Sequence, residues 1–224
     1  MRSGLVLAGL ALFGLAAWAA LDRGNAGLCM LLVAVALILV GVAWHEAGPD
    51  SAKEIALVAT IGGAAAAGRV LFAAIPGVQP VTVIAVCAGA ALGTRAGIAV
   101  GGTAALVSNF FLGQGVWTPW QMLAWGACGA VGAATSTFVR NRYALAAVCF
   151  VLGMAFSSFM DVWNWVTFYD EHTWQTFVAV QARGFPFDLA HAIGNVVIAL
   201  VAGPELCRLL ERYGRRLKAE VVWA

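Results

Sequence analysis

The side chains able to do chemistry stand out in an otherwise apolar sequence, and three of them share one segment. Asp188, His191 and Asn195 are spaced i, i+3 and i+7, which places them on one face of a helix. Arg69 and Asp161 stand alone inside other apolar stretches. An acid, a base and an amide on one face can exchange protons or hold a polar ligand. The elements that carry these residues decide which of these roles is open to them.

Composition places these side chains in a membrane protein. Of 224 residues, 62% are hydrophobic and 11% are charged, and the mean hydropathy is +0.88. Soluble domains are about one quarter charged, so this chain cannot cover a water-soluble surface. These values exclude a cytosolic enzyme, a disordered chain and a nucleic-acid binder with a broad basic face. The 26 glycines, together with many alanines, favour closely packed membrane helices.

Apolar runs of about twenty residues predict an all-α integral membrane protein with about eight membrane spans. The predicted spans are Gly4–Leu21, Ala26–Trp44, Glu54–Ile75, Pro80–Gly93, Gly97–Leu112, Thr118–Val139, Tyr143–Phe168 and Gly184–Gly203. We divide the chain into an N-terminal transmembrane hairpin (1–50), a six-helix core (51–205) and a basic cytoplasmic tail (206–224).

The distribution of basic residues predicts the orientation of these spans. With a cytoplasmic N-terminus, ten of the 13 lysines and arginines fall inside, as the positive-inside rule requires. This predicts a multi-pass protein of the cell (plasma) membrane with both termini in the cytoplasm. The first run is long for a cleaved signal peptide, and whether it is cleaved stays open. The basic stretch Arg208–Lys218 is interpreted as a topology anchor at anionic headgroups.

On this topology, polar side chains from separate helices meet at one level below the external surface. Arg69 lies about 9 Å deep at 1.5 Å per residue, and Asp161 lies at a similar depth. Ser108 and Asn109 lie near the outer end of their span. Ionisable groups in lipid are costly and face the bundle interior or a wet cavity. We therefore expect a cavity open to the outside, with a purely structural pairing of Arg69 with Asp161 or Asp188 as the alternative.

Aromatic residues gather at the same external level. Trp117 and Trp120 flank Thr118, which has capping-box spacing to Gln121 and predicts a helix start with Pro119 at its first position. The outer segment Tyr169–Arg183 is interpreted as a loop or a partly helical lid. Flat aromatic surfaces beside hydrogen-bonding groups suit a large, planar, partly apolar ligand. The candidate substrate-binding residues are Arg69, Gln79, Asn109, Gln114, Trp117, Trp120, Gln121, Asp161, Trp165, Asp188, His191 and Asn195.

Motifs of several enzyme classes are absent from the sequence. It contains no P-loop, so the chain cannot hydrolyse ATP by a Walker mechanism, and no H-E-x-x-H or G-x-S-x-G. We therefore expect a protein that is not an enzyme, with no catalytic residues, no resident cofactor and no metal site. The five cysteines are scattered and are interpreted as small hydrophobes. His191 is interpreted as a packing residue, with ligation of a cobalt or iron centre in a ligand left open.

Three segments resemble the substrate-binding (S) components of energy-coupling factor (ECF) transporters, in the cobalamin-type branch. They are Gly68–Pro80, Gly93–Gly97 and Ser108–Gly126, the last reading SNFFLGQGVWTPWQMLAWG. The resemblance runs from about Glu54 to Gly203, and the N-terminal hairpin lies outside it with its role open. It implies a six-helix S-component core that captures a vitamin, cobalamin or a related corrinoid, at its extracellular face. Such a component delivers its substrate through a membrane scaffold subunit and two ATPase subunits, dedicated or shared.

The resemblance also implies a docking surface for the scaffold subunit on the first core helix. Ala59, Gly63 and Ala67 recur every fourth residue there and form a small-residue face. The alternative is that this face packs against neighbouring helices of the same chain. Two other functions stay open: an S component for haem or another planar cofactor, and a membrane enzyme or assembly factor that uses the same outer cavity. No nucleic-acid partner is expected.

Overall fold

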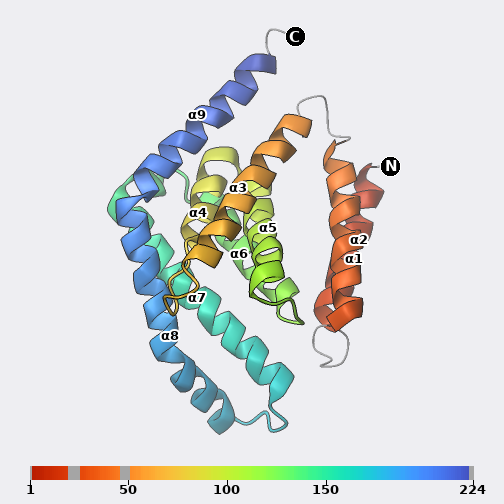
Figure 1. Ribbon diagram of the computed structural model, residues 1–224, viewed down its shortest axis with the longest axis vertical. Coiled ribbons are helices and arrows are strands. Elements are labelled where there is room, and N and C mark those ends of the chain that lie inside the picture. The colour runs from red at the N-terminus through yellow and green to blue at the C-terminus, as the bar shows by residue number, and fades with distance from the viewer. Residues whose placement is uncertain (1, 20–25, 46–50, 222–224) are drawn as a thin grey trace.

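Every regular element in the described part of the chain is helical (Figure 1). The computed structural model describes residues 2–19, 26–45 and 51–221. The elements are α1 (Arg2–Ala19), α2 (Ala26–His45), α3 (Ser51–Leu71), α4 (Val81–Leu92), α5 (Thr94–Leu112), α6 (Thr118–Ala134), the 3-10 helix η1 (Phe138–Arg140), α7 (Arg142–Phe168), α8 (Trp174–Val201) and α9 (Gly203–Val221). The all-α prediction is confirmed. The predicted span end at Leu21, the domain boundary at residue 50 and residues 222–224 of the predicted tail lie outside the described residues.

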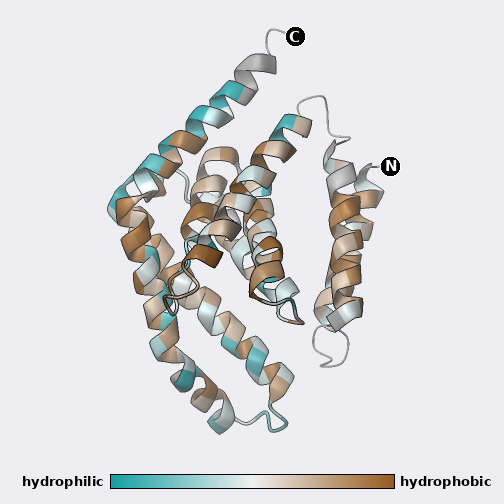
Figure 2. Cartoon of the chain, viewed as in Figure 1, coloured by the Kyte–Doolittle hydropathy of each residue, from teal (hydrophilic) through white to brown (hydrophobic). Residues whose placement is uncertain are grey.

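Four of the described helices are long and apolar enough to cross a membrane. They are α3, α5, α7 and α8, whose apolar segments contain 20, 19, 27 and 28 residues. Shorter apolar segments occur in α1, α2 and α4. Figure 2 shows hydrophobic residues along the helices of the bundle, whereas α9 carries many hydrophilic ones. Length and composition thus support a membrane protein, and the number of eight spans stays a prediction.

The helices form a central bundle with a long hairpin beside it (Figure 1). α3 to α6 make up the bundle, and α7 and α8 run side by side and project past it at one end. α1 and α2 pair with each other and stand beside the bundle, while α9 extends from the opposite end of α8. We call the end with residues 72–80 and 113–117 the Gly113 end, and the end with η1 and α9 the α9 end.

Glycines bring α4, α5 and α6 closer together than larger residues would allow. A Cβ atom on Gly129 of α6 would lie 2.2 Å from the carbonyl carbon of Gly97 in α5. A Cβ on Gly89 of α4 would lie 1.9 Å from the carbonyl oxygen of Gly129. The close packing expected from the glycine and alanine content is confirmed. It fixes the start of α5 against the end of α6, and the same two helices carry several candidate site residues at their other ends.

Several predicted helix ends differ from the structure, most of all at α8. This helix begins at Trp174, so Tyr169–Arg183 is partly helical, as one of the two interpretations had it, and the predicted span start at Gly184 is ten residues too late. Thr173 caps α8: its hydroxyl accepts from the backbone N–H of Thr176, and the Thr176 hydroxyl accepts from that of Thr173. Pro186 lies inside the helix and does not end it. α3 ends at Leu71 and α6 at Ala134, each before the predicted Ile75 and Val139, because turns follow both.

Candidate functional site

Arg69 is the centre of a buried polar network at the Gly113 end. It lies in the last turn of α3 and is only 7% exposed. Its Nη1 donates to Ser108 Oγ and to Asn109 Oδ1, both at 2.6 Å, and its Nε donates to Gln79 Oε1 at 3.1 Å. Its guanidinium also lies over the ring of Trp125, 4.9 Å from the centroid. Residues from α3, α5 and α6 are thus held together around one cation.

No carboxylate neutralises Arg69 among the residues that the structure describes. All of its side-chain hydrogen bonds go to neutral amides and a hydroxyl, and the described ion pairs involve other arginines. The structural alternative, in which Arg69 pairs with Asp161 or Asp188, is therefore wrong. A buried cation without a counter-charge is costly to keep in a membrane bundle. The described partners of Arg69 carry no negative charge, so its positive charge is not neutralised.

Asn109 extends the network to the start of α6. Its Nδ2 donates to Thr118 Oγ1 at 2.9 Å and to Gln121 Oε1 at 2.8 Å. Thr118 Oγ1 donates to Gln114 Oε1, and Gln114 Nε2 donates to the backbone carbonyl of Leu106, both at 2.9 Å. The predicted capping box is wrong: Trp117 is the N-cap residue and makes no side-chain cap. The side chains of Thr118 and Gln121 accept hydrogen bonds from Asn109 and do not cap the helix.

A line of rings connects Arg69 to α8. The Trp125 ring stacks on Phe156 of α7 with centroids 4.2 Å apart, and Phe156 lies 5.4 Å from the ring of His191. Sequence reasoning missed Trp125 and Phe156 as members of the site. Trp125 could have been found, because it lies in the Ser108–Gly126 string that carries the family resemblance. Nothing in the sequence distinguishes Phe156 from the other phenylalanines of α7.

The face predicted for Asp188, His191 and Asn195 is confirmed, since all three are buried on α8. His191 Nδ1 lies 2.7 Å from the carbonyl oxygen of Gly77, so this nitrogen carries the proton and donates. His191 Nε2 is then the acceptor for Asn195 Nδ2 at 3.2 Å. Both ring nitrogens are occupied, which leaves none free to ligate a metal. Among the described residues, no group of three or more potential metal ligands lies together.

Gly77 is the residue that allows this contact. Its φ of +78° lies in the left-handed region, where a residue with a side chain is strained. A Cβ there would also lie 3.0 Å from the backbone nitrogen of His191. The loop between α3 and α4 can therefore reach α8 only because residue 77 is a glycine.

Three buried polar atoms near these residues have no hydrogen-bond partner. They are Trp120 Nε1 of α6, Asp161 Oδ2 of α7 and Asn195 Oδ1 of α8. Asp161 packs so closely on Gly184 that a Cβ there would lie 2.0 Å from its Oδ2. Asp161 also lies close enough to Asp188 for the two to interact electrostatically. Buried polar atoms are rarely left unpaired, so these three are candidates for ligand contacts.

Two of the predicted tryptophans make other contacts. Trp165 donates through Nε1 to Thr176 Oγ1 at 2.9 Å, and its ring lies 4.9 Å from that of His172 and 5.4 Å from that of Phe177. These contacts all belong to the tip of the α7–α8 hairpin. Trp117 folds back over Gly115, where a Cβ would lie 2.4 Å from its ring. The structure therefore places Trp165 in the tip and Trp117 beside the Gln114 loop.

The small-residue face of α3 has no neighbour in the described part of the chain. Ala59 and Ala67 are exposed, and no atom lies within 4 Å of a Cβ placed on Gly63. The opposite side of α3 packs on α5, where a Cβ on Gly62 would lie 2.8 Å from the side chain of Thr103. The alternative in which Ala59, Gly63 and Ala67 pack against the protein's own helices is therefore not what the structure shows.

Comparison with known proteins gives one match. Residues 50–210 match DUF6580, a family of unknown function. No curated protein and no solved structure matches the chain. The matched segment includes α3 to α8 and the start of α9, and so the whole Arg69 network, whereas α1 and α2 lie outside it.

Proposed function

The chain belongs to the DUF6580 family, and we propose that it is the substrate-capturing membrane subunit of an ECF-type importer. In this proposal the Gly113 end faces the cell exterior and both termini lie in the cytoplasm. The substrate is a vitamin with an anionic group and a planar, partly apolar body, and cobalamin or a related corrinoid is our first candidate. The resemblance of Ser108–Gly126 to S components supports this assignment.

The observation that carries the proposal is the unneutralised cation of Arg69. A purely structural arginine inside a bundle would be expected to pair with a carboxylate, because an isolated buried charge is costly. Arg69 has amides, a hydroxyl and an indole ring around it instead. In this proposal an anionic substrate group supplies the missing charge. The ring of Trp125, which is fully buried and stacked on Phe156, holds the guanidinium of Arg69 in place beside it.

The unpaired atoms of α6, α7 and α8 support a ligand with several polar groups. Trp120 Nε1 can donate, whereas Asn195 Oδ1 can accept. A corrinoid carries amide side chains that can do both. These contacts orient the ligand, and the charge on Arg69 contributes most of the discrimination against neutral analogues.

The transporter class also needs partners, because the sequence has no ATPase motif. We propose that the open face of Ala59, Gly63 and Ala67 docks the membrane scaffold subunit, which in turn binds two ATPase subunits. Small residues let a second helix approach closely in a membrane, where no hydrophobic effect drives association. The exposure of Ala59 and Ala67 supports this role.

Titration of the purified full-length protein with cobalamin, cobinamide and haem tests the substrate assignment. We expect at least one of them to bind in the nanomolar to micromolar range. Arg69→Met should weaken that binding by about tenfold or more, since it removes a charge-assisted contact. Arg95→Met is the matched control, because Arg95 is exposed and pairs with Glu54 away from the site.

Two results would overturn parts of the proposal. Equal affinity for Arg69→Met and Arg95→Met removes Arg69 from the substrate site. Binding of none of the three ligands removes the planar cofactors as substrates and leaves co-purification to test the class. Recovery of a scaffold and two ATPases with the chain supports transport, whereas turnover by the isolated chain supports a membrane enzyme that uses Asp161 and Asp188.

A further inference from the structure

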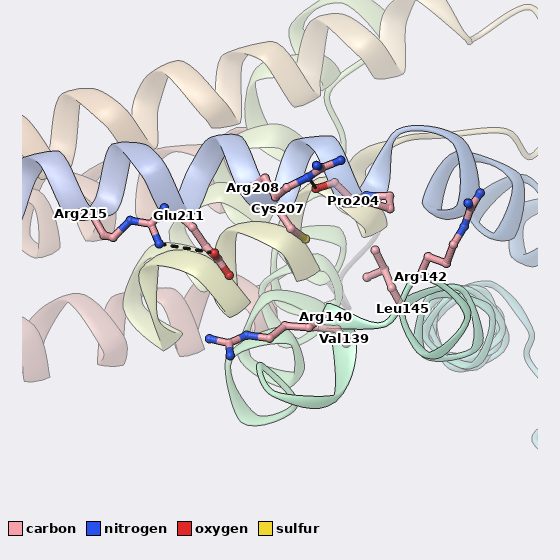
Figure 3. Close-up of a pocket in the computed structure, with 9 residues that line it drawn as sticks. All are labelled: Val139, Arg140, Arg142, Leu145, Pro204, Cys207, Arg208, Glu211 and Arg215. Carbon is pink, nitrogen blue, oxygen red and sulfur yellow. Dashed lines mark hydrogen bonds and ion pairs between the residues drawn. The ribbon is translucent and has the colours of Figure 1, made fainter.

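A second candidate site lies at the α9 end, across the bundle from Arg69. A cavity of about 560 Å³ opens between α9, η1 and the start of α7 (Figure 3). Ligand sites in proteins have volumes of roughly 300–1,000 Å³, so the cavity can hold a headgroup-sized molecule. Four of its nine lining residues are arginines and one is an acid: Arg140, Arg142, Arg208, Arg215 and Glu211.

Two distant parts of the sequence supply these arginines. Asn141 caps α7, since its side chain accepts from the backbone N–H groups of Tyr143 and Ala144, and this turn presents Arg140 and Arg142. On α9, Arg208 and Arg215 are seven residues apart and share one helix face. Figure 3 shows Arg208 and Arg215 on α9, Arg140 across the opening from them, and Arg142 at one end of it beside Leu145.

The packing of α9 on α4 fixes the position of this arginine face. Cys207 Sγ lies 2.7 Å from Cys87 Sγ, and Leu210 is 3% exposed. A Cβ on Gly214 would lie 2.9 Å from the side chain of Leu92. α9 is therefore a packed amphipathic helix and not a loose basic tail, and it holds its arginines against the opening.

The positive charges of the cavity exceed the negative charges available to them. Arg208 pairs with Glu205, and Arg215 lies 4.0 Å from Glu211. Arg142 donates only to the backbone carbonyl of Leu200, at 2.9 Å. Arg140 has no hydrogen bond or ion pair with any described residue. Two guanidinium groups thus face the opening without a carboxylate partner.

The guanidinium groups and the apolar residues that line the cavity indicate which anion it can bind. Guanidinium groups bind phosphate oxygens through two parallel hydrogen bonds, and clusters of arginine favour phosphate over single carboxylates. The floor contains Val139 and Leu145, both buried and apolar, while Phe138 and Tyr143 beside it are 59% and 70% exposed. Exposed aromatic residues next to a basic opening are typical of a membrane–water boundary.

We propose that this cavity binds a phosphate group through the arginines that line it, Arg140 and Arg142 around the start of α7 and Arg208 and Arg215 on α9. The phosphate can belong to the headgroup of an anionic phospholipid or to a free phosphate-bearing molecule, and the chemistry of recognition is the same for both. The site is independent of the Arg69 network and of the direction in which the protein faces.

Binding of the full-length protein to two kinds of phosphate tests this site. One arm reconstitutes the protein in nanodiscs of phosphatidylcholine with and without phosphatidylglycerol, and counts retained phosphatidylglycerol by native mass spectrometry. The other arm titrates inorganic phosphate and pyrophosphate into protein in neutral detergent. Retention of phosphatidylglycerol alone identifies a lipid site, whereas saturable binding of the free anions identifies a soluble ligand, and both support the proposal.

Paired variants of α9 distinguish a site from general surface charge. Arg208→Gln with Arg215→Gln should weaken phosphate binding about tenfold. Arg212→Gln with Arg216→Gln removes the same charge from exposed positions of the same helix outside the cavity lining, and should change it less than about twofold. Arg140→Gln alone should also weaken binding, and it breaks no hydrogen bond or ion pair with a described residue. Equal losses in both α9 pairs, or no phosphate binding in either arm, overturn the proposal.

Discussion

Both ring nitrogens of His191 have hydrogen-bond partners within the protein. Its Nδ1 donates to the Gly77 carbonyl and its Nε2 accepts from Asn195 Nδ2. The residue is 2% exposed. Asn195 Oδ1 and Asp161 Oδ2, by contrast, have unused hydrogen-bonding capacity. The first kind of residue stabilises the fold, and the second kind is available to a ligand.

Replacing His191 should therefore affect stability more than chemistry. His191→Phe keeps a ring beside Phe156 but leaves the buried carbonyl of Gly77 without its donor. An unsatisfied buried group costs about 1–3 kcal/mol, so we expect thermal unfolding in detergent to shift to lower temperature. His172→Phe is the control, because His172 is exposed at the α7–α8 tip and should change stability by less than about 0.5 kcal/mol. Equal unfolding temperatures for both variants would contradict this role of His191.

At the scale of helices, the same residue type has opposite roles on two sides of the bundle. Gly97 of α5 and Gly129 of α6 bring the backbones of the two helices into direct contact. Gly63 on α3, by contrast, faces open space. Both patterns look alike in sequence, because glycines and alanines recur along each helix. Only the structure separates the small residues that hold the bundle together from those, such as Gly63, that have no contact in the described part of the chain.

Adding one methyl group to each kind of glycine should give opposite results. Gly129→Ala places a Cβ 2.2 Å from the Gly97 backbone, so α5 and α6 must separate. Overpacking of this kind costs about 1–3 kcal/mol or more. Gly63→Ala meets no atom within 4 Å and should be neutral or slightly stabilising, by up to about 1 kcal/mol, because alanine favours helix. Denaturation monitored by tryptophan fluorescence compares them, and a tolerated Gly129→Ala would refute the tight contact.

For the molecule as a whole, the two candidate sites lie at opposite ends of the bundle. The Arg69 network belongs to the Gly113 end, and the arginine cavity belongs to the α9 end. If helices of this length cross the membrane, the two sites face different compartments. The excess of basic residues at the α9 end predicts that this end is cytoplasmic.

Cysteine labelling tests this orientation. In a variant without the five native cysteines, Asp170→Cys at the tip of α7–α8 should react with a membrane-impermeant maleimide added to intact cells. Arg212→Cys on α9 should react only after the cells are opened, because it lies at the other end. Labelling of Arg212→Cys in intact cells would invert the topology and place the Arg69 network on the cytoplasmic side.

The sequence predicted the helical class, and the grouping of several polar residues at one end of the bundle, better than the hydrogen-bond partners of these residues. Arg69 donates to Asn109, which donates to Gln121, because the end of α3, the end of α5 and the start of α6 all lie at the Gly113 end of the bundle. Their hydrogen bonds could not be predicted, since rotation of a helix about its axis decides whether Arg69 faces Asp161 or Asn109. The start of α8 was misplaced because Gly184 and Pro186 look like helix breakers, whereas the Thr173 cap is a weaker sequence signal.

The proline inside α8 has a mechanical consequence. Pro186 has no N–H, so the carbonyl of Ala182 lacks its usual partner one turn earlier and the helix is weakest at that level. Gly184, pressed against Asp161, lies within this turn. Bending there would shift the first turns of α8, Trp174 to Phe185, and loosen the contact of Gly184 with Asp161 of α7, while His191 and Asn195 stay held in the second half of α8.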